Sequence, residues 1–419
     1  MKSAILEIND HNLLLKTQDG SLFIEPGFAH ITVEGIETGE QARALAWASP
    51  QASYNDYWRQ LNQIALPTKH AWARHHADIA FAQLKQILSL ANSPDDLIIV
   101  VPGSFSDDQL SLLLGLADAL PIKIKAIVDT ALAACANQSK SNVFVELQLH
   151  QTVVSLVALN DGKMTVSQQE IIPTIGVLHI YNSIARHISE TLIKTYRYDP
   201  LHTSEGEQAI YDQIPVWLTR LRWEEDIVIK LPSPKGVLTL QLHKANIAKI
   251  LQPRISSLKA AIQKYPEITL TFSHSAILIP SLFKEYADAE VLLSSCAVEN
   301  CSKLETTLKG FELHRIRSLE NTATTKTIKT TAQRVTHLLH NGHAYSLSRP
   351  LSFEIKKGQL HITHEINGTA TFIVVIEGEK LKILQQKPDI EIKLPHYLKP
   401  GEFIHFADTK LQLLEVDDA

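Results

Sequence analysis

The chain has 419 residues, of which 45% are hydrophobic and 20% charged, so it is long enough for two or three domains with buried cores. Its formal net charge of -5, with Lys and Arg scattered along the sequence, gives no general attraction to nucleic acid or to an acidic membrane. No apolar run approaches the ~20 residues that a membrane-spanning helix requires. We therefore expect a cytoplasmic protein that does not bind nucleic acid and does not insert into a membrane.

The first part of the chain alternates short strands with turns and then changes to helical spacing. The segments "AILEI", "NLLLKT", "SLFIEPG" and "HITVEG" predict an antiparallel meander. Apolar residues at helical spacing predict helices in "EQARALAWA" and in "AWARHHADIAFAQLKQILSLA". The run "DDLIIVVPGSF" predicts a buried strand, and Ser106 with Gln109 forms a capping box for the helix that follows.

A second set of strands and helices follows the first. Strands are predicted in "IKIKAIV" and "NVFVELQLHQTVVSLVAL", and helices in "GVLHIYNSIARHISETLIKTY" and "EQAIYDQIPVWLTRL". A hairpin, "DIVIKL" with "GVLTLQL", precedes a long helix, and "ITLTFSHSAILIPSLFKEY" predicts strand, turn and helix. The two successive sets indicate a mixed α/β body with two related halves over residues 1–318.

The composition changes again towards the C-terminus. Residues 319–334 are rich in Thr and Lys and poor in large apolar residues, which is typical of a linker. Residues 335–419 contain about eight short strands with turns such as Lys357-Gly358 and Asn367-Gly368, and this spacing predicts a small all-β sandwich.

Five segments of the first 318 residues match motifs of one family in that family's order. They are Ile5–Asn12 ("ILEINDHN"), Val101–Gln109 ("VPGSFSDDQ"), Ile127–Cys135 ("IVDTALAAC"), Glu146–Gln151 ("ELQLHQ") and His274–Pro280 ("HSAILIP"). In this respect the chain resembles the actin-like ATPase superfamily, most closely its DnaK-type heat-shock chaperone branch. The resemblance implies a two-lobed, duplicated ribonuclease H-like ATPase fold, in which the first and fourth segments are phosphate hairpins and the fifth is an adenosine turn.

The glycines of those three turns are replaced in this sequence. The replacing residues are Asn9 in the first hairpin, Gln148, Leu149 and His150 in the second, and His274 and Ser275 beside the adenosine. In the family, backbone N–H groups hold the phosphates because glycine permits close approach and positive φ. Side chains at these positions would fill the volume of the phosphates or the base.

The threonines of the two hairpins are replaced as well. Asp10, His11 and Gln151 stand in their places, and Asp10 would bring a negative charge towards a polyphosphate. We therefore expect a degenerate nucleotide cleft and no bound cofactor. Its residues would be Asn9, Asp10, His11, Gln148, His150, His274 and Ser275.

Three acidic positions of the family are still acidic, at Glu7, Asp129 and Glu146, whereas a fourth is replaced by Val153. The resemblance implies that such carboxylates orient magnesium and the attacking water, and carboxylates could hold a cation through water. Alternatively, they form ordinary salt bridges or accept hydrogen bonds from neighbouring turns. The first reading predicts an active ATPase with ATP and Mg as cofactors, in which Glu7 and Glu146 lie at the metal. The second predicts neither catalytic nor metal-binding residues.

The C-terminal sandwich is similar to a forkhead-associated domain through Leu398–Val416 and Tyr345–Pro350. In that family a glycine-arginine pair and a Ser/His loop bind phosphothreonine; Arg349 could stand for the arginine, but Ser348 replaces the glycine and the Ser/His loop is not evident. We therefore expect a protein-interaction sandwich, with phosphothreonine binding through Arg349 as an alternative. Three functions follow from the sequence. The expected one is a chaperone-like pseudo-ATPase that serves as a protein-interaction scaffold or regulator in a cytoplasmic assembly. The alternatives are an active Mg-dependent ATPase and a phosphopeptide-binding adaptor.

Three further groups of residues suggest chemistry but have ordinary explanations. His70, His75, His76 and Asp78 lack the His-x3-His spacing of a metal site and predict a solvated helix face. Cys135, Cys296 and Cys301 lack the partners of a zinc site and predict buried thiols. Aromatic residues in "ALAWASPQASYNDYWRQL" predict core packing, with a partner interface as the alternative. They are Trp47, Tyr54, Tyr57 and Trp58.

Overall fold

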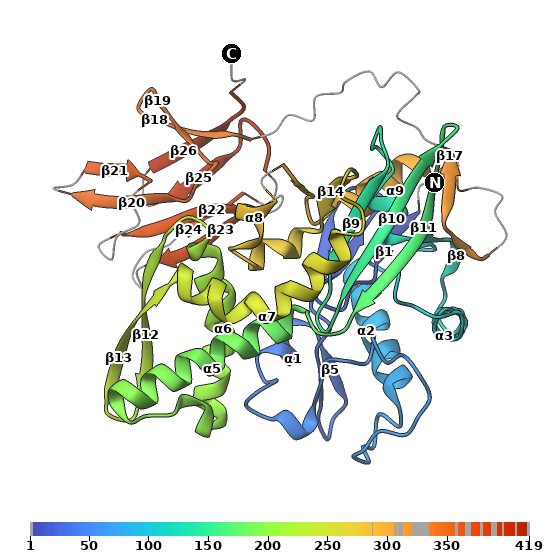
Figure 1. Ribbon diagram of the computed structural model, residues 1–419, viewed down its shortest axis with the longest axis horizontal. Helices are drawn as coiled ribbons and strands as arrows, with labels where there is room; N and C mark the ends of the chain where they lie inside the picture. Colours follow the sequence, from blue (N-terminus) through green and yellow to red (C-terminus); the bar gives the residue numbers. More distant parts are fainter. Residues whose placement is uncertain are drawn as a thin grey trace. The chain divides into compact units, whose positions relative to one another are not determined.

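The structure is a computed structural model whose chain divides into two compact units, Met1–Thr325 and Lys326–Ala419 (Figure 1). The described residues are 3–286, 288–305, 308, 313–320, 335–356, 359–364, 370–377, 380–386, 392–395, 398–406 and 409–416, without the side chains of 283, 284, 359, 377, 380 and 385. The predicted linker lies outside the described residues from 321 to 334.

The first unit is a mixed α/β body built on two six-stranded sheets. The first sheet has the order β16-β8-β7-β1-β2-β3. Its members are β1 (Ala4–Glu7), β2 (Leu13–Lys16), β3 (Leu22–Glu25), β7 (Asp96–Val101), β8 (Lys123–Asp129) and β16 (Arg315–Ile316). Strands β1, β2 and β3 are antiparallel, whereas β7 and β8 run parallel to β1. The predicted meander is therefore confirmed for three strands.

The fourth predicted strand of the meander belongs to another sheet. Strand β4 (Ala29–Ile31) pairs with β5 (Ile36–Thr38) and β6 (Ser53–Tyr54). The chain leaves the first sheet at Gly27, whose N–H donates to the carbonyl oxygen of Asp10 at 3.0 Å. A Cβ at Gly27 would lie 2.3 Å from that oxygen, so this close approach requires glycine.

The second sheet has the order β15-β14-β9-β10-β11-β17. Its members are β9 (Asn142–Leu147), β10 (Thr152–Asn160), β11 (Lys163–Ile172), β14 (Thr269–Phe272), β15 (Glu290–Val291) and β17 (Ser318–Glu320). Three consecutive antiparallel strands again lie beside later strands that run parallel to the first of them. The two sheets thus repeat one arrangement. Strand β17 includes Leu319 and Glu320, which the sequence analysis placed in the linker, because Leu319 is buried and pairs with Met164.

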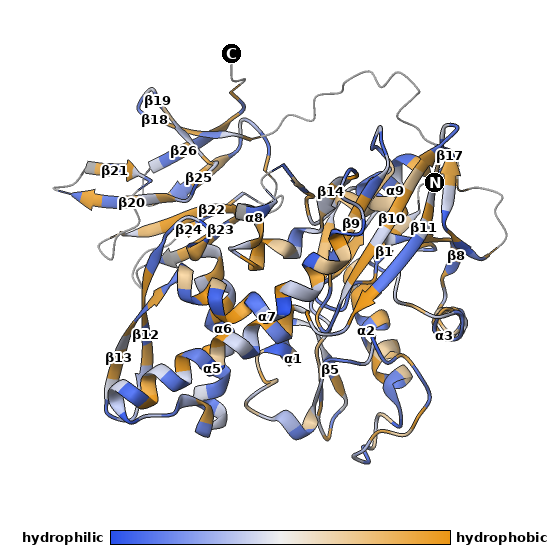
Figure 2. Ribbon diagram, viewed as in Figure 1, coloured by the Kyte–Doolittle hydropathy of each residue, from blue (hydrophilic) through white to orange (hydrophobic). Residues whose placement is uncertain are grey.

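Helices surround the two sheets. They are α1 (Glu40–Arg43), α2 (His76–Leu90), α3 (Asp107–Asp118), α4 (Thr130–Cys135), α5 (Val177–Tyr196), α6 (Ser204–Leu221), α7 (Lys244–Ile262), α8 (Leu282–Glu285) and α9 (Cys296–Leu304), with 3-10 turns η1 (Pro50–Ala52), η2 (Pro200–His202) and η3 (His274–Leu278). The predicted hairpin is confirmed as β12 (Asp226–Ser233) with β13 (Gly236–His243). Figure 2 shows helices such as α5 and α7 with one hydrophobic and one polar face.

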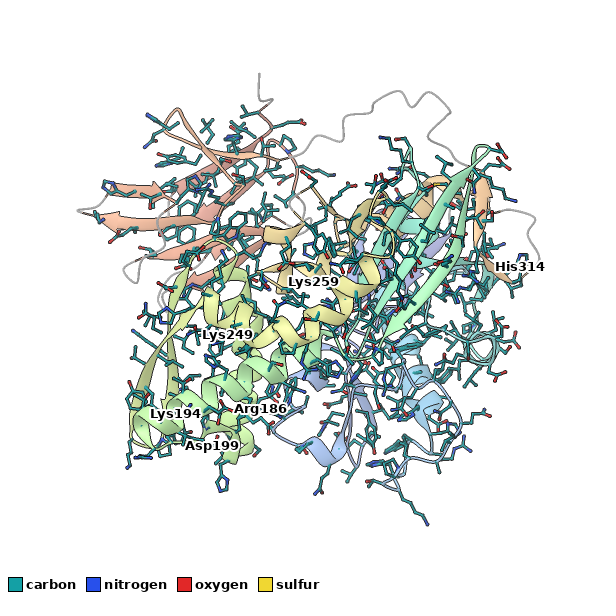
Figure 3. The ribbon with its side chains drawn as sticks, viewed as in Figure 1. Arg186, Lys194, Asp199, Lys249, Lys259 and His314 are labelled. Atoms are coloured by element: carbon teal, nitrogen blue, oxygen red, sulfur yellow. The ribbon has the colours of Figure 1, made fainter. Side chains whose placement is uncertain are left out.

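Side chains at the ends of these helices fix neighbouring elements. Asp199 before η2 accepts a hydrogen bond from Ser189 of α5 at 2.7 Å, and Lys259 of α7 pairs with Glu285 of α8 at 2.5 Å; Figure 3 labels Asp199 and Lys259. The capping box of α3 is confirmed, since the backbone N–H of Gln109 donates to Ser106 Oγ at 3.3 Å.

Two predicted helices begin or end elsewhere. The helix predicted over "EQARALAWA" is limited to one turn, α1, which ends at Arg43. Helix α2 begins at His76, and the carboxylate of Asp78 in its first turn accepts hydrogen bonds from the backbone N–H groups of Arg74 and His75, the two residues that precede the helix.

A buried glutamine holds the N-terminal part of the first unit together. Gln83 on α2 has no exposed surface, and its Oε1 accepts hydrogen bonds from Tyr57 Oη at 2.6 Å and Trp58 Nε1 at 2.7 Å. Its Nε2 donates to the carbonyl oxygen of Pro26 at 2.8 Å. Of the aromatic residues noted in the sequence, Tyr57 and Trp58 are thus core residues, as predicted.

Replacing Gln83 should destabilise the first unit. In Gln83→Ala the Tyr57 hydroxyl and Trp58 indole N–H stay buried without an acceptor, so we expect a loss of roughly 2–4 kcal/mol in the free energy of unfolding. Urea denaturation followed by Trp fluorescence measures this loss. Lys85→Ala, at an exposed position of the same helix, is the matched control and should change stability by less than about 0.5 kcal/mol. Equal effects of the two variants would contradict the role of Gln83.

The described elements of the second unit are all strands. One sheet has the order β19-β18-β26-β25-β24 and consists of β18 (His337–His340), β19 (His343–Ser346), β24 (Ile392–Lys393), β25 (Phe403–Phe406) and β26 (Thr409–Leu414). The other has the order β21-β20-β22-β23 and consists of β20 (Leu351–Lys356), β21 (Gln359–Thr363), β22 (Phe372–Glu377) and β23 (Lys380–Gln386). The rings of Phe353 and Phe372 stack in their common core, with centroids 4.2 Å apart.

Candidate functional site

Two hairpin turns of the first unit lie against each other where strands of the two sheets end. Turn 1 comprises residues 8–12, between β1 and β2, and turn 2 comprises residues 148–151, between β9 and β10. They contain most of the residues predicted to form the degenerate cleft. Side chains connect the two turns directly, as follows.

Asn9 of turn 1 reaches the end of strand β9. Its Nδ2 donates to Glu146 Oε1 at 3.2 Å and lies 3.5 Å from the carbonyl oxygen of Leu147. Its Oδ1 accepts the backbone N–H of His11 at 3.0 Å, which stabilises the turn in the way that asparagine commonly does. Because the side chain is 9% exposed, these are buried polar contacts.

Asp10 provides the second contact. Its Oδ1 accepts the backbone N–H of Leu149, in the middle of turn 2, at 2.7 Å. Asp10 is 5% exposed, and its other oxygen, Oδ2, is buried without a hydrogen-bond partner in the described structure. Burial raises the pKa of Asp10, while the charges of His150 and Arg59 and the Leu149 N–H act in the opposite direction. The backbone N–H of Leu149 in turn 2 therefore already has an acceptor, the side-chain carboxyl group of Asp10.

His11 provides the third contact, from turn 1 to η3. Its Nδ1 lies 2.9 Å from Ser275 Oγ. Burial, followed by the charges of His274 and Arg43, lowers the pKa of His11 to about 4, so the imidazole is neutral at neutral pH. His274 and Ser275 thus lie beside turn 1, as the sequence predicted for the cleft.

Turn 2 is held by its own amides and by the start of α5. Gln148 Oε1 accepts hydrogen bonds from Gln151 Nε2 at 3.0 Å and Ser104 Oγ at 3.4 Å, while Gln148 Nε2 is buried without a partner in the described structure. The N–H groups of Val177 and Leu178 donate to the turn's carbonyl oxygens at 2.9 Å. These contacts bring the helix so near that a Cβ on Gly176 would lie 2.4 Å from the carbonyl carbon of His150.

His150 does not point into the contact between the turns. Its Nε2 lies 2.9 Å from the carbonyl oxygen of Asn55, a residue between β6 and α2. Of the predicted cleft residues, Asn9, Asp10 and His11 therefore bridge the turns or η3, Gln148 lies buried within turn 2, and His150 connects turn 2 to the 55–75 segment.

Glu7 and Glu146 are acidic groups in an unfavourable environment. Burial raises the pKa of Glu7 to about 8. Burial raises the pKa of Glu146 well above its usual range, and the charge of Glu7 raises it further. Glu146 is 2% exposed and its described hydrogen bond comes from Asn9. Glu7 is therefore largely protonated at neutral pH, and the environment of Glu146 favours its protonated form.

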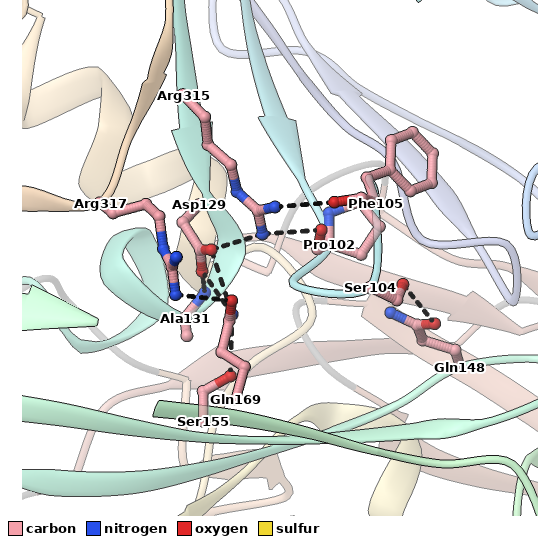
Figure 4. A network of polar contacts seen from close by, with 10 residues as sticks. All are labelled: Pro102, Ser104, Phe105, Asp129, Ala131, Gln148, Ser155, Gln169, Arg315 and Arg317. Atoms are coloured by element: carbon pink, nitrogen blue, oxygen red, sulfur yellow. Dashed lines mark hydrogen bonds and ion pairs between the residues drawn. The ribbon is translucent and has the colours of Figure 1, made fainter. Parts of the chain in front are cut away.

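Asp129 has a different environment and is neutralised by arginine (Figure 4). Its Oδ2 lies 2.5 Å from Arg315 Nη2 and accepts Gln169 Nε2 at 3.1 Å, and its Oδ1 accepts the Ala131 N–H and so caps α4. Arg315 also donates to the carbonyl oxygens of Pro102 and Phe105. Among the described residues, no group of three or more His, Cys, Asp or Glu is arranged to hold a metal ion. Glu7, Asp129 and Glu146 accordingly do not fit a magnesium site that requires all three.

A second contact region lies at the segment after α1. The ring of Trp47 stacks on Tyr211 of α6, with centroids 4.0 Å apart and an interplanar angle of 14°. Gln208 Oε1 accepts the N–H groups of Trp47 and Ala48, and its Nε2 donates to the carbonyl oxygen of Arg43. Sequence reasoning noted Trp47 but missed Tyr211 and Gln208, which lie on a helix with no motif.

The remaining candidates behave as ordinary side chains. His75 and Asp78 belong to the start of α2, and His70 Nε2 lies 2.7 Å from Tyr54 Oη. Cys135 and Cys301 are buried free thiols, and Cys296 is partly buried. Arg349 lies exposed between β19 and β20, so its predicted role in phosphothreonine binding stays a prediction.

Comparison with known proteins gave no matching family model and no significant match to a curated protein. Within the described residues, no helix combines the length and apolar character needed to cross a bilayer. The geometry of the turns is therefore the basis for any functional proposal.

The raised pKa of Glu7 predicts a pH-dependent stability. The unfolded chain releases this proton near pH 4.5 and the folded chain near pH 8, so the contribution of Glu7 is fully present below pH 4.5 and is lost as the pH rises through 8. As the pH rises from 6 to 8, the unfolding free energy of the unsubstituted protein should fall by about 1–2 kcal/mol more than that of Glu7→Gln, because only Glu7 has a proton to release.

Urea denaturation at several pH values measures this difference. Glu37→Gln, at an exposed position, is the control and should follow the unsubstituted protein. If Glu7→Gln and the unsubstituted protein lost stability in parallel over this range, the folded protein would not raise the pKa of Glu7.

Proposed function

We propose that the first unit has an actin-like, DnaK-type ATPase fold in which nucleotide binding is weak or lost, and that the protein acts as an interaction scaffold or regulator in a cytoplasmic assembly. The repeated arrangement of two sheets and the order of the five motifs support the fold. The observation that supports the loss of nucleotide binding most directly is the 2.7 Å hydrogen bond from the Leu149 N–H to Asp10.

This hydrogen bond competes with any phosphate at turn 2. A phosphate held there would need the Leu149 N–H that Asp10 already accepts. An ionised Asp10 would also repel the phosphate, by about 1 kcal/mol at 4 Å in water and about 4 kcal/mol near a protein surface. If a phosphate displaced Asp10 from the Leu149 N–H, the carboxyl group of Asp10 would need another hydrogen-bond donor. Both the competition for the Leu149 N–H and the repulsion by Asp10 disfavour a nucleotide in the family's usual position.

Contacts between the protein's own side chains support a scaffold role. Turn 1 is joined to turn 2 and to η3 by hydrogen bonds between the protein's own groups, and the Trp47–Tyr211 stack with Gln208 joins the α1 segment to α6. In this proposal, these direct contacts take the place of a nucleotide between the turns, so that the protein presents one fixed surface to its partners.

Calorimetry tests the proposal directly. Titration of the full chain with ATP and magnesium should give no binding heat at millimolar nucleotide, and phosphate release should stay at the level of buffer alone. Micromolar binding would overturn the proposal.

The second candidate is an active Mg-dependent ATPase that uses Glu7, Asp129 and Glu146. One observation favours it: Glu7 and Asp129 both raise the pKa of Glu146, so the three carboxyl groups are close enough to interact. It requires the Arg315–Asp129 pair to open, because Arg315 now occupies Asp129. Micromolar ATP binding that Glu146→Gln abolishes would establish this candidate.

A pair of Asp10 variants tests the contact between the turns. Asp10→Ala leaves the buried Leu149 N–H without an acceptor and should lower the unfolding free energy by roughly 1–3 kcal/mol. Asp10→Asn keeps an acceptor oxygen without the buried charge and should stay close to the unsubstituted protein. Thermal unfolding of both variants separates these outcomes, and equal losses would show that the hydrogen bond to Leu149 does not stabilise the protein.

A further inference from the structure

The outward face of the five-stranded sheet in the second unit carries two adjacent rows of different character. Strand register places Phe403 opposite Gln412, Gln412 opposite Leu339, and Leu339 opposite Ala344, which makes an apolar row with one amide. The next outward row places His405 between Lys410 and Lys393. Two residues along a strand separate the rows, which corresponds to about 7 Å.

The alternation of exposure shows that these rows face away from the core. Leu338, Ile404, Leu411 and Leu413 point to the core and are buried, whereas Phe403, next to Ile404 on β25, is 37% exposed. His405 and Lys410 are exposed as well. The ring of Phe403 is therefore partly exposed on this face, with the ring of His405 6.3 Å away between centroids.

Within its described strands the sheet carries basic but no acidic side chains, while Glu402 and Glu415 adjoin the ends of β25 and β26. The strands as described, HLLH, HAYS, IK, FIHF and TKLQLL, contain four histidines and two lysines but no aspartate or glutamate. Lys410 forms no ion pair within the described part of the chain. The face therefore complements an anionic group in charge and an apolar side chain in shape.

A hollow of about 430 Å³ lies on this face. Its lining joins both rows to the turn between β18 and β19. The lining residues are Leu339, His340, Asn341, Gly342, Phe403, Thr409, Lys410 and Gln412. Arg349 is not among them, because it follows β19 at the end away from this turn. The hollow is thus separate from the predicted phosphothreonine anchor.

We propose that this hollow binds an acidic peptide segment of a partner protein, with an apolar side chain against Phe403 and Leu339 and a carboxylate at Lys410. The spacing of the rows matches an extended segment in which an acidic side chain stands two residues from an apolar one, because residues i and i+2 lie on one face about 7 Å apart. A nucleic acid fits less well, because phosphate chains are bound by dense Lys and Arg, and the whole chain carries a net charge of -5. The inference rests on the proposed scaffold role but concerns the second unit alone. The nucleotide titration therefore tests the proposed function, and the peptide-binding experiment tests this inference, each without the other.

Fluorescence anisotropy with the full chain tests the proposal. The probe is a short labelled peptide rich in glutamate with spaced leucine and phenylalanine. The control peptide has the same sequence with lysine in place of each glutamate. The glutamate peptide should bind in a salt-dependent manner, the lysine peptide should not, and Lys410→Glu and Phe403→Ala should each weaken binding about tenfold or more. Lys356→Glu, on the other sheet and 57% exposed, is the matched control and should bind as the unsubstituted protein does.

Several outcomes would overturn the proposal. One is that the glutamate peptide fails to bind, and another is that Lys356→Glu weakens its binding as much as Lys410→Glu does. Phosphatidylserine vesicles or a DNA oligonucleotide binding as tightly as the peptide, or self-association that Lys410→Glu abolishes, would identify another occupant. Binding of a phosphothreonine peptide alone, lost in Arg349→Ala, would place the site at Arg349 instead. Since Phe403 and Lys410 are exposed, unchanged circular dichroism of the variants verifies that any loss is not a loss of folding.

Discussion

The hydrogen bond from the Leu149 N–H to the carboxylate of Asp10 is the interaction around which the centre of the first unit is arranged. It joins the turn of one sheet to the turn of the other and places the protein's own anion at a backbone donor. The neighbouring contacts follow from it, since Asn9 and His11 flank Asp10 on a turn of fixed shape. A single residue in turn 1 thereby sets how the strand ends of both sheets meet.

This arrangement encloses acidic groups that have few partners. Burial and then the charge of Glu7 raise the pKa of Glu146, and Asp10 leaves one oxygen without a hydrogen bond in the described structure. Burying such groups costs free energy, and at Asp10 the hydrogen bond from Leu149 offsets that cost. The surrounding apolar strands and the Gln83 network supply the stability that the acidic centre does not.

The sequence predicted the local elements of this centre and few of its long-range contacts. Alternating apolar residues located both hairpins, and the missing glycines identified their turns as unusual. The partners of Asp129 and Trp47 could not be found in this way, because Arg315 is 186 residues from Asp129 and Gln208 is 161 residues from Trp47. Neither partner belongs to a motif or a periodic pattern, so only the folded chain brings them together. The short α1 was mispredicted because helical spacing alone does not show where a helix ends.

Strands β16 and β17 follow one another with only Arg317 between them, yet each is an edge strand of a different sheet. Three pairs of backbone positions tie β17 to β11, and β16 carries the arginine that neutralises Asp129. A polypeptide that stopped at His314 would strip one border from each sheet and leave a buried acid uncompensated. Anyone separating the two units by proteolysis or recombinant dissection should therefore cut beyond Glu320.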